Sequence, residues 1–201
     1  AKQGAEVIVT VDNGISCIDG VTHAKSLGMQ VVVTDHHLPG DVLPPADAIV
    51  NPNQPGCEFP SKNLAGVGVA FYIMLALKAE LQQQGHFEKA GLAPPNLASL
   101  LDIVAVGTVA DVVVLDKNNR ILVHQGLQRI RAGKCRPGIK ALVEVANRDC
   151  AHLTSTDLGF VVGPRLNAAG RLDDMSQGIA CLLEDETIQA RMIAAELDAL
   201  N

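Results

Sequence analysis

The sequence predicts an α/β protein in which a parallel sheet is followed by a mostly helical half. Two short β-branched segments, 6–11 and 30–34, flank a helical segment at 19–27. This is the spacing of a strand–helix–strand unit, whose two strands run parallel. After residue 63, long segments with helical periodicity replace the short apolar runs. Because 48% of the residues are hydrophobic, the chain can bury a substantial core, which argues against disorder.

Turn residues mark the ends of the expected strands. The first strand, 6–11 (EVIVTV), is closed by Asp12-Asn13-Gly14, and Gly28 ends the helix that follows it. The second strand is 30–34 (QVVVT), and a third short strand at 46–50 is closed by Asn51-Pro52. The remaining expected elements are helices over 67–84, 96–112, 118–132, 138–146, 155–162, 175–183 and 187–200. We therefore expect an α/β domain over 1–115 and a helical remainder over 116–201.

Cysteine usage and hydropathy exclude several protein classes. The five cysteines are odd in number, scattered, and never spaced as C-x-x-C, which argues against a disulfide framework or a zinc finger. We expect reduced thiols in a cytoplasmic protein. The longest apolar run is far shorter than a membrane span, so no membrane partner is expected.

Charge is distributed unevenly along the chain. The net charge is −6, but residues 120–171 contain nine Lys or Arg against three Asp or Glu, and residues 172–201 contain one against seven. An uneven solvated surface explains such runs in most proteins. The alternative is a phosphate-binding face in the third quarter of the chain. With no Trp, one Tyr and four Phe, stacking on aromatic rings is a poor basis for nucleic-acid binding.

Candidate functional residues follow the first two strands. Asp12 ends the first strand and Asp35-His36-His37 ends the second. In parallel α/β sheets ligands bind outside the carboxyl ends of the strands, so these side chains should meet at one edge. A lone Asp in this place is more often a turn former or helix cap, and that alternative stays open for Asp12. The triplet is harder to explain as a turn.

Carboxylates with imidazole and no thiolate suit Mn²⁺ or Mg²⁺. A carboxylate that bridges two such ions would allow two-metal cleavage of a phosphoester. A third candidate, Asp111, follows the apolar segment LLDIVAVGTVA and is itself flanked by apolar residues; it is either an ordinary surface carboxylate or a metal ligand. The sequence contains no G-x-G-x-x-G, Walker or G-x-S-x-G motif, which argues against dinucleotide-binding, NTPase and serine-hydrolase functions.

These motifs resemble those of the DHH phosphoesterases. The matching segments are VTVDNG with Asp12, VVVTDHH with Asp35-His36-His37, and VGTVAD with Asp111, in the family's order. Further segments resemble the family's single-strand-specific 5′→3′ DNA exonucleases, and the similarity runs through essentially the whole chain. They are 41–53 (DVLPPADAIVNPN), 64–69 (LAGVGV) and 163–174 (GPRLNAAGRLDD).

The resemblance implies a role for each matching residue. Asp12 would bridge two Mn²⁺ or Mg²⁺ ions, and His36 and Asp111 would be further metal ligands. His37 would face the scissile phosphate, with Asp35 orienting its neighbours. The implied DNA-binding residues are Arg165, Asn167 and Arg171; without the resemblance, GPRLNAAGRL suggests an ordinary helix end.

The implied function is hydrolysis of single-stranded DNA in repair and recombination, with a helicase and a single-strand-binding protein as expected partners. A DHH pyrophosphatase, or a phosphodiesterase for short oligonucleotides or cyclic dinucleotides, is the alternative enzyme. The alternative that is not an enzyme is a noncatalytic DHH-like scaffold that binds partners. The family's earlier Asp-rich motif is absent from residues 1–11. We therefore expect a fragment of a catalytic core, preceding a second DNA-gripping domain, that alone binds metal weakly and has little or no nuclease activity.

Overall fold

The computed structural model describes residues 2–172 and 175–201, without the side chains of residues 171 and 172. The chain forms two compact units: residues 1–97 with 113–119, and residues 98–112 with 120–201. The expected division after residue 115 stays a prediction.

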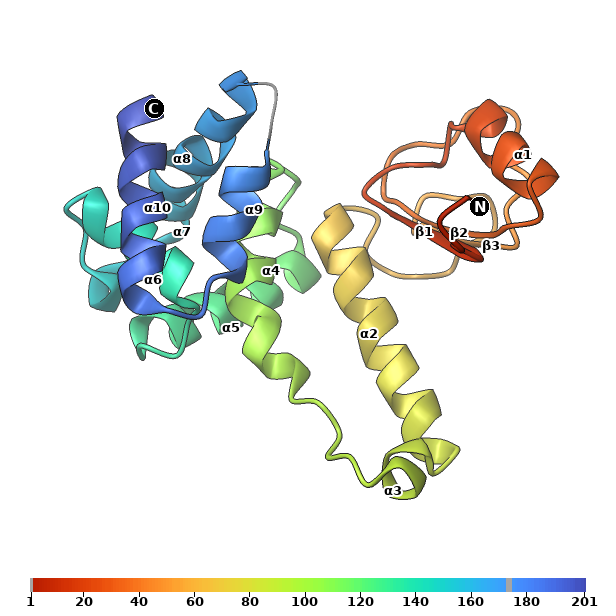
Figure 1. Cartoon of the computed structure of the whole chain (residues 1–201), viewed down its shortest axis with the longest axis horizontal. Coiled ribbons are helices and arrows are strands. Elements are labelled where there is room, and N and C mark those ends of the chain that lie inside the picture. The colour runs from red at the N-terminus through yellow and green to blue at the C-terminus, as the bar shows by residue number, and fades with distance from the viewer. Residues whose placement is uncertain (1, 173–174) are drawn as a thin grey trace. The chain divides into compact units, whose positions relative to one another are not determined.

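The first unit contains a parallel sheet of three strands. They are β1 (Val7–Val11), β2 (Gln30–Thr34) and β3 (Ala48–Val50), in the order β1-β2-β3 (Figure 1). Val11 is in register with Thr34, and Thr34 with Val50, so the three strands end side by side. The predicted α/β class with a parallel sheet is confirmed.

Helix α1 (Ile18–Ser26) connects β1 to β2 and covers one face of the sheet. Its inward residues Val21 and Ala24 pack with Val31 and Val33 of β2, all at most 6% exposed. Burying a valine side chain contributes roughly 1.5–3 kcal/mol. This core fixes the strand ends, and with them the residues that follow each strand.

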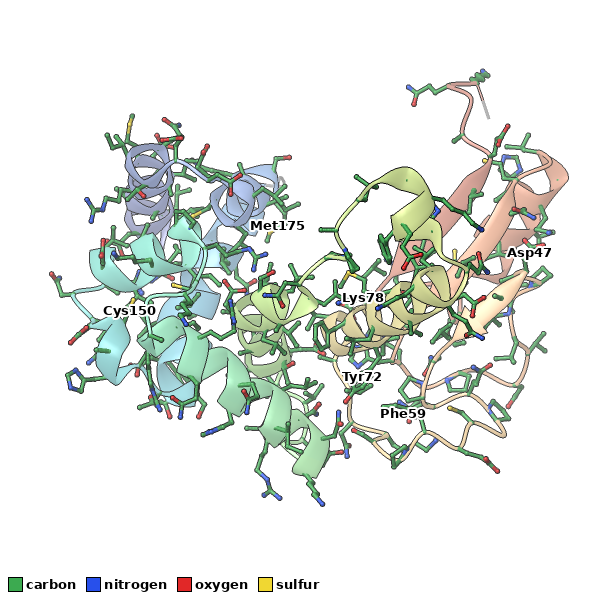
Figure 2. The ribbon with its side chains drawn as sticks, turned by 90° about the horizontal axis from the view of Figure 1, so that it is seen from below. Asp47, Phe59, Tyr72, Lys78, Cys150 and Met175 are labelled. Carbon is green, nitrogen blue, oxygen red and sulfur yellow. The ribbon has the colours of Figure 1, made fainter. Side chains whose placement is uncertain are left out.

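Helix α2 (Gly66–Gln83) completes the first unit, with the short α3 (His86–Ala90) after it. Tyr72 of α2 lies edge-on to Phe59 with ring centroids 5.1 Å apart (Figure 2). The Tyr72 hydroxyl donates to Asn118 Oδ1 at 2.6 Å. Helix α3 was not predicted; Gly85 and Gly91, both at φ 65°, flank its five residues.

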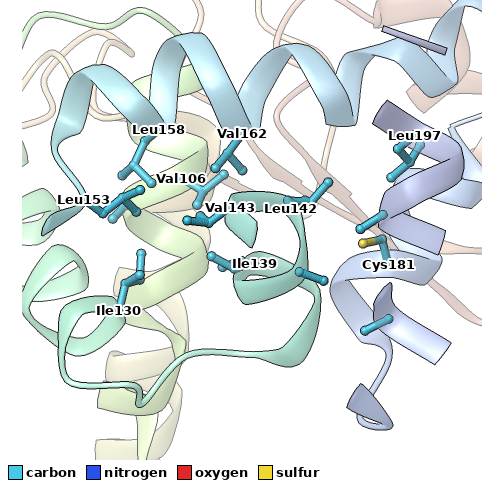
Figure 3. Close-up of a cluster of buried hydrophobic side chains, with 14 of the residues drawn as sticks. Val106, Ile130, Ile139, Leu142, Val143, Leu153, Leu158, Val162, Cys181 and Leu197 are labelled. Atoms are coloured by element: carbon cyan, nitrogen blue, oxygen red, sulfur yellow. The ribbon is translucent and has the colours of Figure 1, made fainter. Parts of the chain in front are cut away.

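The second unit is helical, and two of its elements begin in the first unit, which includes Leu97 and residues 117–119. Its elements are the 3₁₀ turn Leu97–Leu100, α4 (Leu101–Ala110), α5 (Lys117–Arg131), α6 (Pro137–Val145), the 3₁₀ turn Cys150–His152, α7 (Ser155–Asp157), a π-helix (Leu158–Val162), α8 (Gly163–Ala168), the 3₁₀ turn Ala169–Leu172, α9 (Ser176–Leu183) and α10 (Thr187–Leu200). Residues Ile139, Leu142 and Val143 of α6 are fully buried in its core (Figure 3). Among the described residues, no helix has both the length and the apolar character to cross a bilayer.

The segment after residue 155 differs from the sequence prediction. A helix over 155–162 was expected, but helical structure continues to Leu172. The π-helix ends at Val162, and Pro164 stands in the first turn of α8. Proline is tolerated in the first turn of a helix, because its missing N–H would have no partner within that helix. Helical structure can therefore run through the proline into the GPRLNAAGRL motif.

Candidate metal centre

Two threonines join the ends of β1 and β2. Thr34 Oγ1 donates to Thr10 O at 2.6 Å, and Thr34 N donates to Thr10 Oγ1 at 3.2 Å. Immediately after β1, Asp12 adopts φ 64°. This left-handed conformation is uncommon for residues other than glycine, and Asp tolerates it better than most. The turn therefore takes up a conformational cost at the residue predicted to bridge two metals.

Asp35 is fully buried and accepts hydrogen bonds from four donors. Its Oδ2 accepts from Ile15 N at 2.9 Å; its Oδ1 accepts from His36 N at 2.8 Å, His37 N at 3.2 Å and His37 Nδ1 at 2.7 Å. Burial opposes ionisation, but these hydrogen bonds outweigh it and lower the pKa of Asp35 below its ordinary value. The buried carboxylate thus fixes the loop that carries both histidines.

Asp12, His36 and His37, which follow β1 and β2, come together in one cluster. One ligand atom from each lies within 4.8 Å of the others. His36 Nε2 is 3.0 Å from Asp12 Oδ1, and the two imidazole rings have centroids 4.4 Å apart. The His36 side chain is 11% exposed and that of Asp12 54% exposed, so the cluster is open on one side.

The first residue of α2 leaves room for the Asp12 carboxylate. A Cβ added at Gly66 would lie 2.3 Å from Asp12 Oδ1 and 2.6 Å from Asp12 Cγ. No side chain can occupy this position without displacing the carboxylate. The LAGVGV segment therefore brings the backbone of α2 against the cluster.

His37 borders an open hollow beside the cluster. Its side chain is 59% exposed, and the hollow has a volume of about 310 Å³. Asp35 and the loop from Asn13 to Cys17, which leads into α1, line the rest of it. The hollow can admit a solvent-exposed group next to the imidazole.

Asp111 lies in the second unit, where it follows the last turn of α4 and is exposed. The next residue, Val112, has φ 59° and is 87% exposed. A β-branched residue is rarely found in this conformation. The strained backbone at Val112 marks this turn as unusual, and the role of Asp111 as a metal ligand stays a prediction.

The predicted DNA-binding residues are placed differently from one another. The Arg165 side chain is 15% exposed; Nη2 pairs with Asp198 at 2.7 Å and Nη1 donates to Val161 O at 2.9 Å. Asn167 is exposed on α8, and the side chain of Arg171 lies outside the described residues. The Arg136 guanidinium pairs with the buried Asp102, and Arg131 Nε donates to Leu153 O at 2.8 Å. The ion pairs of Arg136 and Arg165 reduce the positive charge that 120–171 can offer a phosphate.

Comparison with known proteins assigns the family. The "DHH family, N-terminal domain" matches residues 3–108, which is more than half of the chain. This chain belongs to the DHH family.

Relatives of this DHH chain match it along almost its entire length. It is 69% identical over 199 residues to the single-stranded-DNA-specific exonuclease RecJ of Salmonella typhimurium and to that of Escherichia coli, covering 99% of this chain and 34% of each relative. The chain thus spans about a third of these relatives. A crystal structure of exonuclease RecJ bound to manganese superposes with a TM-score of 0.80 at 34% identity, over 98% of this chain and 47% of that one. A RecJ structure with Mg²⁺ from Thermus thermophilus gives a TM-score of 0.67 at 31% identity, over 97% and 25%.

The donors of the cluster of Asp12, His36 and His37 are one carboxylate and two imidazoles, without sulfur. This set suits a borderline divalent ion such as Mn²⁺, since carboxylates bind Mn²⁺ well and imidazoles bind first-row transition metals. Neighbouring ligands of an octahedral ion, each about 2.1 Å from the metal, lie about 3.0 Å apart. The 3.0 Å between His36 Nε2 and Asp12 Oδ1 has this spacing. The two side chains are close enough to share an ion or to form a direct hydrogen bond.

Three residues that hold the cluster of Asp12, His36 and His37 in place were not predicted from the sequence. Gly66 gives room to Asp12, and Asn51 and Asn53 bond to the backbone of the two histidines. The segments containing them were singled out only by resemblance. The Asn51-Pro52-Asn53 segment was interpreted as the turn that ends the third strand, which gave no indication of its partners.

Proposed function

We propose that this chain forms part of the catalytic core of an exonuclease that hydrolyses single-stranded DNA from the 5′ end with Mn²⁺ or Mg²⁺, in repair and recombination. The observation that carries the proposal is the cluster of Asp12, His36 and His37 at the carboxyl edge of the sheet. The 69% identity to single-stranded-DNA-specific exonucleases over 99% of the chain supports this substrate over a small one.

Each residue of the cluster has a separate task in this proposal. Asp12 and His36 would hold metal, and Asp111 keeps its predicted role as a further ligand. The chemistry supplied by two bound ions is activation of water and neutralisation of charge on the phosphoryl oxygens. Because His37 Nδ1 donates to Asp35, the proton of the neutral ring sits on Nδ1 and Nε2 is the atom that acts on the substrate.

The scissile phosphate would lie in the hollow beside His37. A protonated His37 would donate to a phosphoryl or leaving-group oxygen, and the ionised Asp35 would stabilise that protonated ring. Asn167 and Arg171 would hold phosphates further along the strand, with Arg165 contributing from its ion pair. A helicase, a single-strand-binding protein and a cytoplasmic location belong to the same proposal.

A chimera tests the proposal: this chain replaces the matching segment of the E. coli relative. In the presence of Mn²⁺, the chimera is assayed on a 5′-phosphorylated single-stranded oligonucleotide labelled at either end. Duplex DNA, pyrophosphate and a cyclic dinucleotide are assayed in parallel. Stepwise release of mononucleotides from the 5′ end, with duplex spared, is the expected result. Turnover of the small substrates alone would contradict it and favour a small-substrate phosphodiesterase or pyrophosphatase. Inactivity on all of them despite bound metal would favour a scaffold.

Matched histidine variants show whether the cluster performs the reaction. His37→Ala should abolish cleavage. His23→Ala should leave it unchanged, because His23 is exposed in the last turn of α1, at the opposite edge of the sheet. Equal activity of the two variants would refute the role of His37.

A further inference from the structure

The backbone of the His36-His37 loop is held from two opposite sides. On one side Asp35 accepts from the N–H groups of both histidines. On the other side two asparagines donate to their carbonyls: Asn53 Nδ2 to His36 O at 2.6 Å, and Asn51 Nδ2 to His37 O at 2.9 Å. Every backbone polar group of the two residues therefore has a fixed partner.

The two asparagines are themselves fixed. Asn51 is 1% exposed, and its Oδ1 accepts from Asn53 N at 2.8 Å. Asn53 Nδ2 also donates to Lys62 O at 3.2 Å. The Lys62 ammonium in turn donates to Pro52 O at 2.7 Å and Cys57 O at 2.6 Å. The loop after β3 is thus held by its own hydrogen bonds, and its two asparagines in turn hold the loop after β2.

We propose that Asn51 and Asn53 are positioning residues for the two histidines. Asn53 sets the carbonyl of His36, and so the imidazole that approaches Asp12. Asn51 sets the carbonyl of His37, which borders the hollow. The inference rests on the proposed phosphodiesterase function, and it adds residues that touch neither metal nor substrate.

The chemistry of the contacts requires an amide. Each backbone carbonyl can only accept, so the group facing it must donate, and an Asn side chain offers two N–H donors. An Asp of the same shape would place carboxylate oxygens against the carbonyl. Asn→Asp should therefore disturb the loop at least as much as Asn→Ala, although it preserves side-chain volume.

The two positions should give different defects. Loss of the Asn53 contact releases His36 and should weaken metal binding by about 10- to 100-fold, the usual effect of removing a partner of a metal ligand. Loss of the Asn51 contact releases His37 and should lower kcat with little change in metal affinity. A purely structural role would change neither quantity in this pattern.

Gln54→Ala is the matched control, because Gln54 lies in the same loop and its Nε2 donates to the carbonyl of Ile49 at 2.9 Å, not to a histidine. In the chimera, Mn²⁺ binding is measured by electron paramagnetic resonance, kcat and KM by oligonucleotide cleavage, and folding by thermal unfolding. Asn53→Ala and Asn53→Asp test the effect on Mn²⁺ affinity. Both variants should fold, because Asn53 is only partly buried. Asn51→Asp accompanies Asn51→Ala because it keeps an acceptor for Asn53 N, so the pair separates loss of the donor to His37 O from loss of the contact between the two asparagines.

We expect folded Asn53 variants to bind Mn²⁺ at least 10-fold more weakly than the Gln54→Ala control, and Asn51 variants to lose kcat. Asn53 variants that bind Mn²⁺ within twofold of the control would overturn the inference. A wild-type chimera that binds Mn²⁺ but does not cleave DNA would contradict the proposed function instead. The Mn²⁺ titration of the Asn53 variants would still decide the inference.

Discussion

Replacing Gly66 by alanine should disable the site without unfolding the protein. The added Cβ would lie 2.3 Å from Asp12 Oδ1, whereas ordinary contacts begin at 3.4 Å, so the carboxylate must move by about 1.1 Å (3.4 − 2.3). Asp12 has limited freedom to adjust its backbone, because it already occupies the left-handed region at φ 64°. A displacement of about 1 Å in a catalytic group costs about 100-fold in rate.

The chimera described above allows this to be measured. Gly66→Ala should lower cleavage of single-stranded DNA about 100-fold and weaken Mn²⁺ binding in the resonance titration. The added Cβ would also lie 2.6 Å from Asp12 Cβ, so the free energy of unfolding should fall by about 1–3 kcal/mol while the variant stays folded. Gly40→Ala is the control, because a Cβ there would meet no atom within 4 Å. A Gly66→Ala variant with activity within threefold of the control would refute the inferred placement of Asp12.

Three further predictions concern the charged residues. Asp35→Asn should lower the free energy of unfolding at pH 7 by roughly 3–5 kcal/mol, because a buried anionic acceptor of four hydrogen bonds is lost. Since its folded pKa lies below the ordinary 3.8, the stability Asp35 provides is present above that value and is lost as pH falls through the folded pKa. Acid titration of unfolding should therefore be flatter for Asp35→Asn than for the wild type; superimposable curves would contradict this. Asp111→Ala should abolish cleavage by the chimera while preserving its thermal unfolding, and residual activity above a few per cent would exclude an essential ligand. Arg171→Ala should weaken oligonucleotide binding and reduce the salt dependence of binding by about one phosphate contact. Arg165→Ala should mainly lower the free energy of unfolding, by about 1.5–3 kcal/mol, because its contacts with Asp198 and Val161 are lost. An unchanged salt slope for Arg171→Ala would remove it from the DNA path.

The sequence by itself determined the α/β class and the location of the cluster. Both follow from local properties: β-branched runs make strands, a connecting helix forces them parallel, and parallel strands deliver whatever follows them to one edge. Asp12 and His36 could therefore be placed together from two segments alone. The structure confirms the sheet and brings these side chains to 3.0 Å.

Only the tertiary structure decided what holds that cluster in place. Asn51 bonds to a carbonyl 14 residues away and Asn53 to one 17 residues away, and Gly66 gives room to a carboxylate from a different element. Turn propensity describes Asn51-Pro52-Asn53 equally well whether or not its side chains reach another loop. The internal ion pair of Arg165 was equally hidden, because a basic residue shows its partner only once the helices have packed. Local sequence sets backbone conformation over a few residues, whereas these contacts depend on how separate elements pack together.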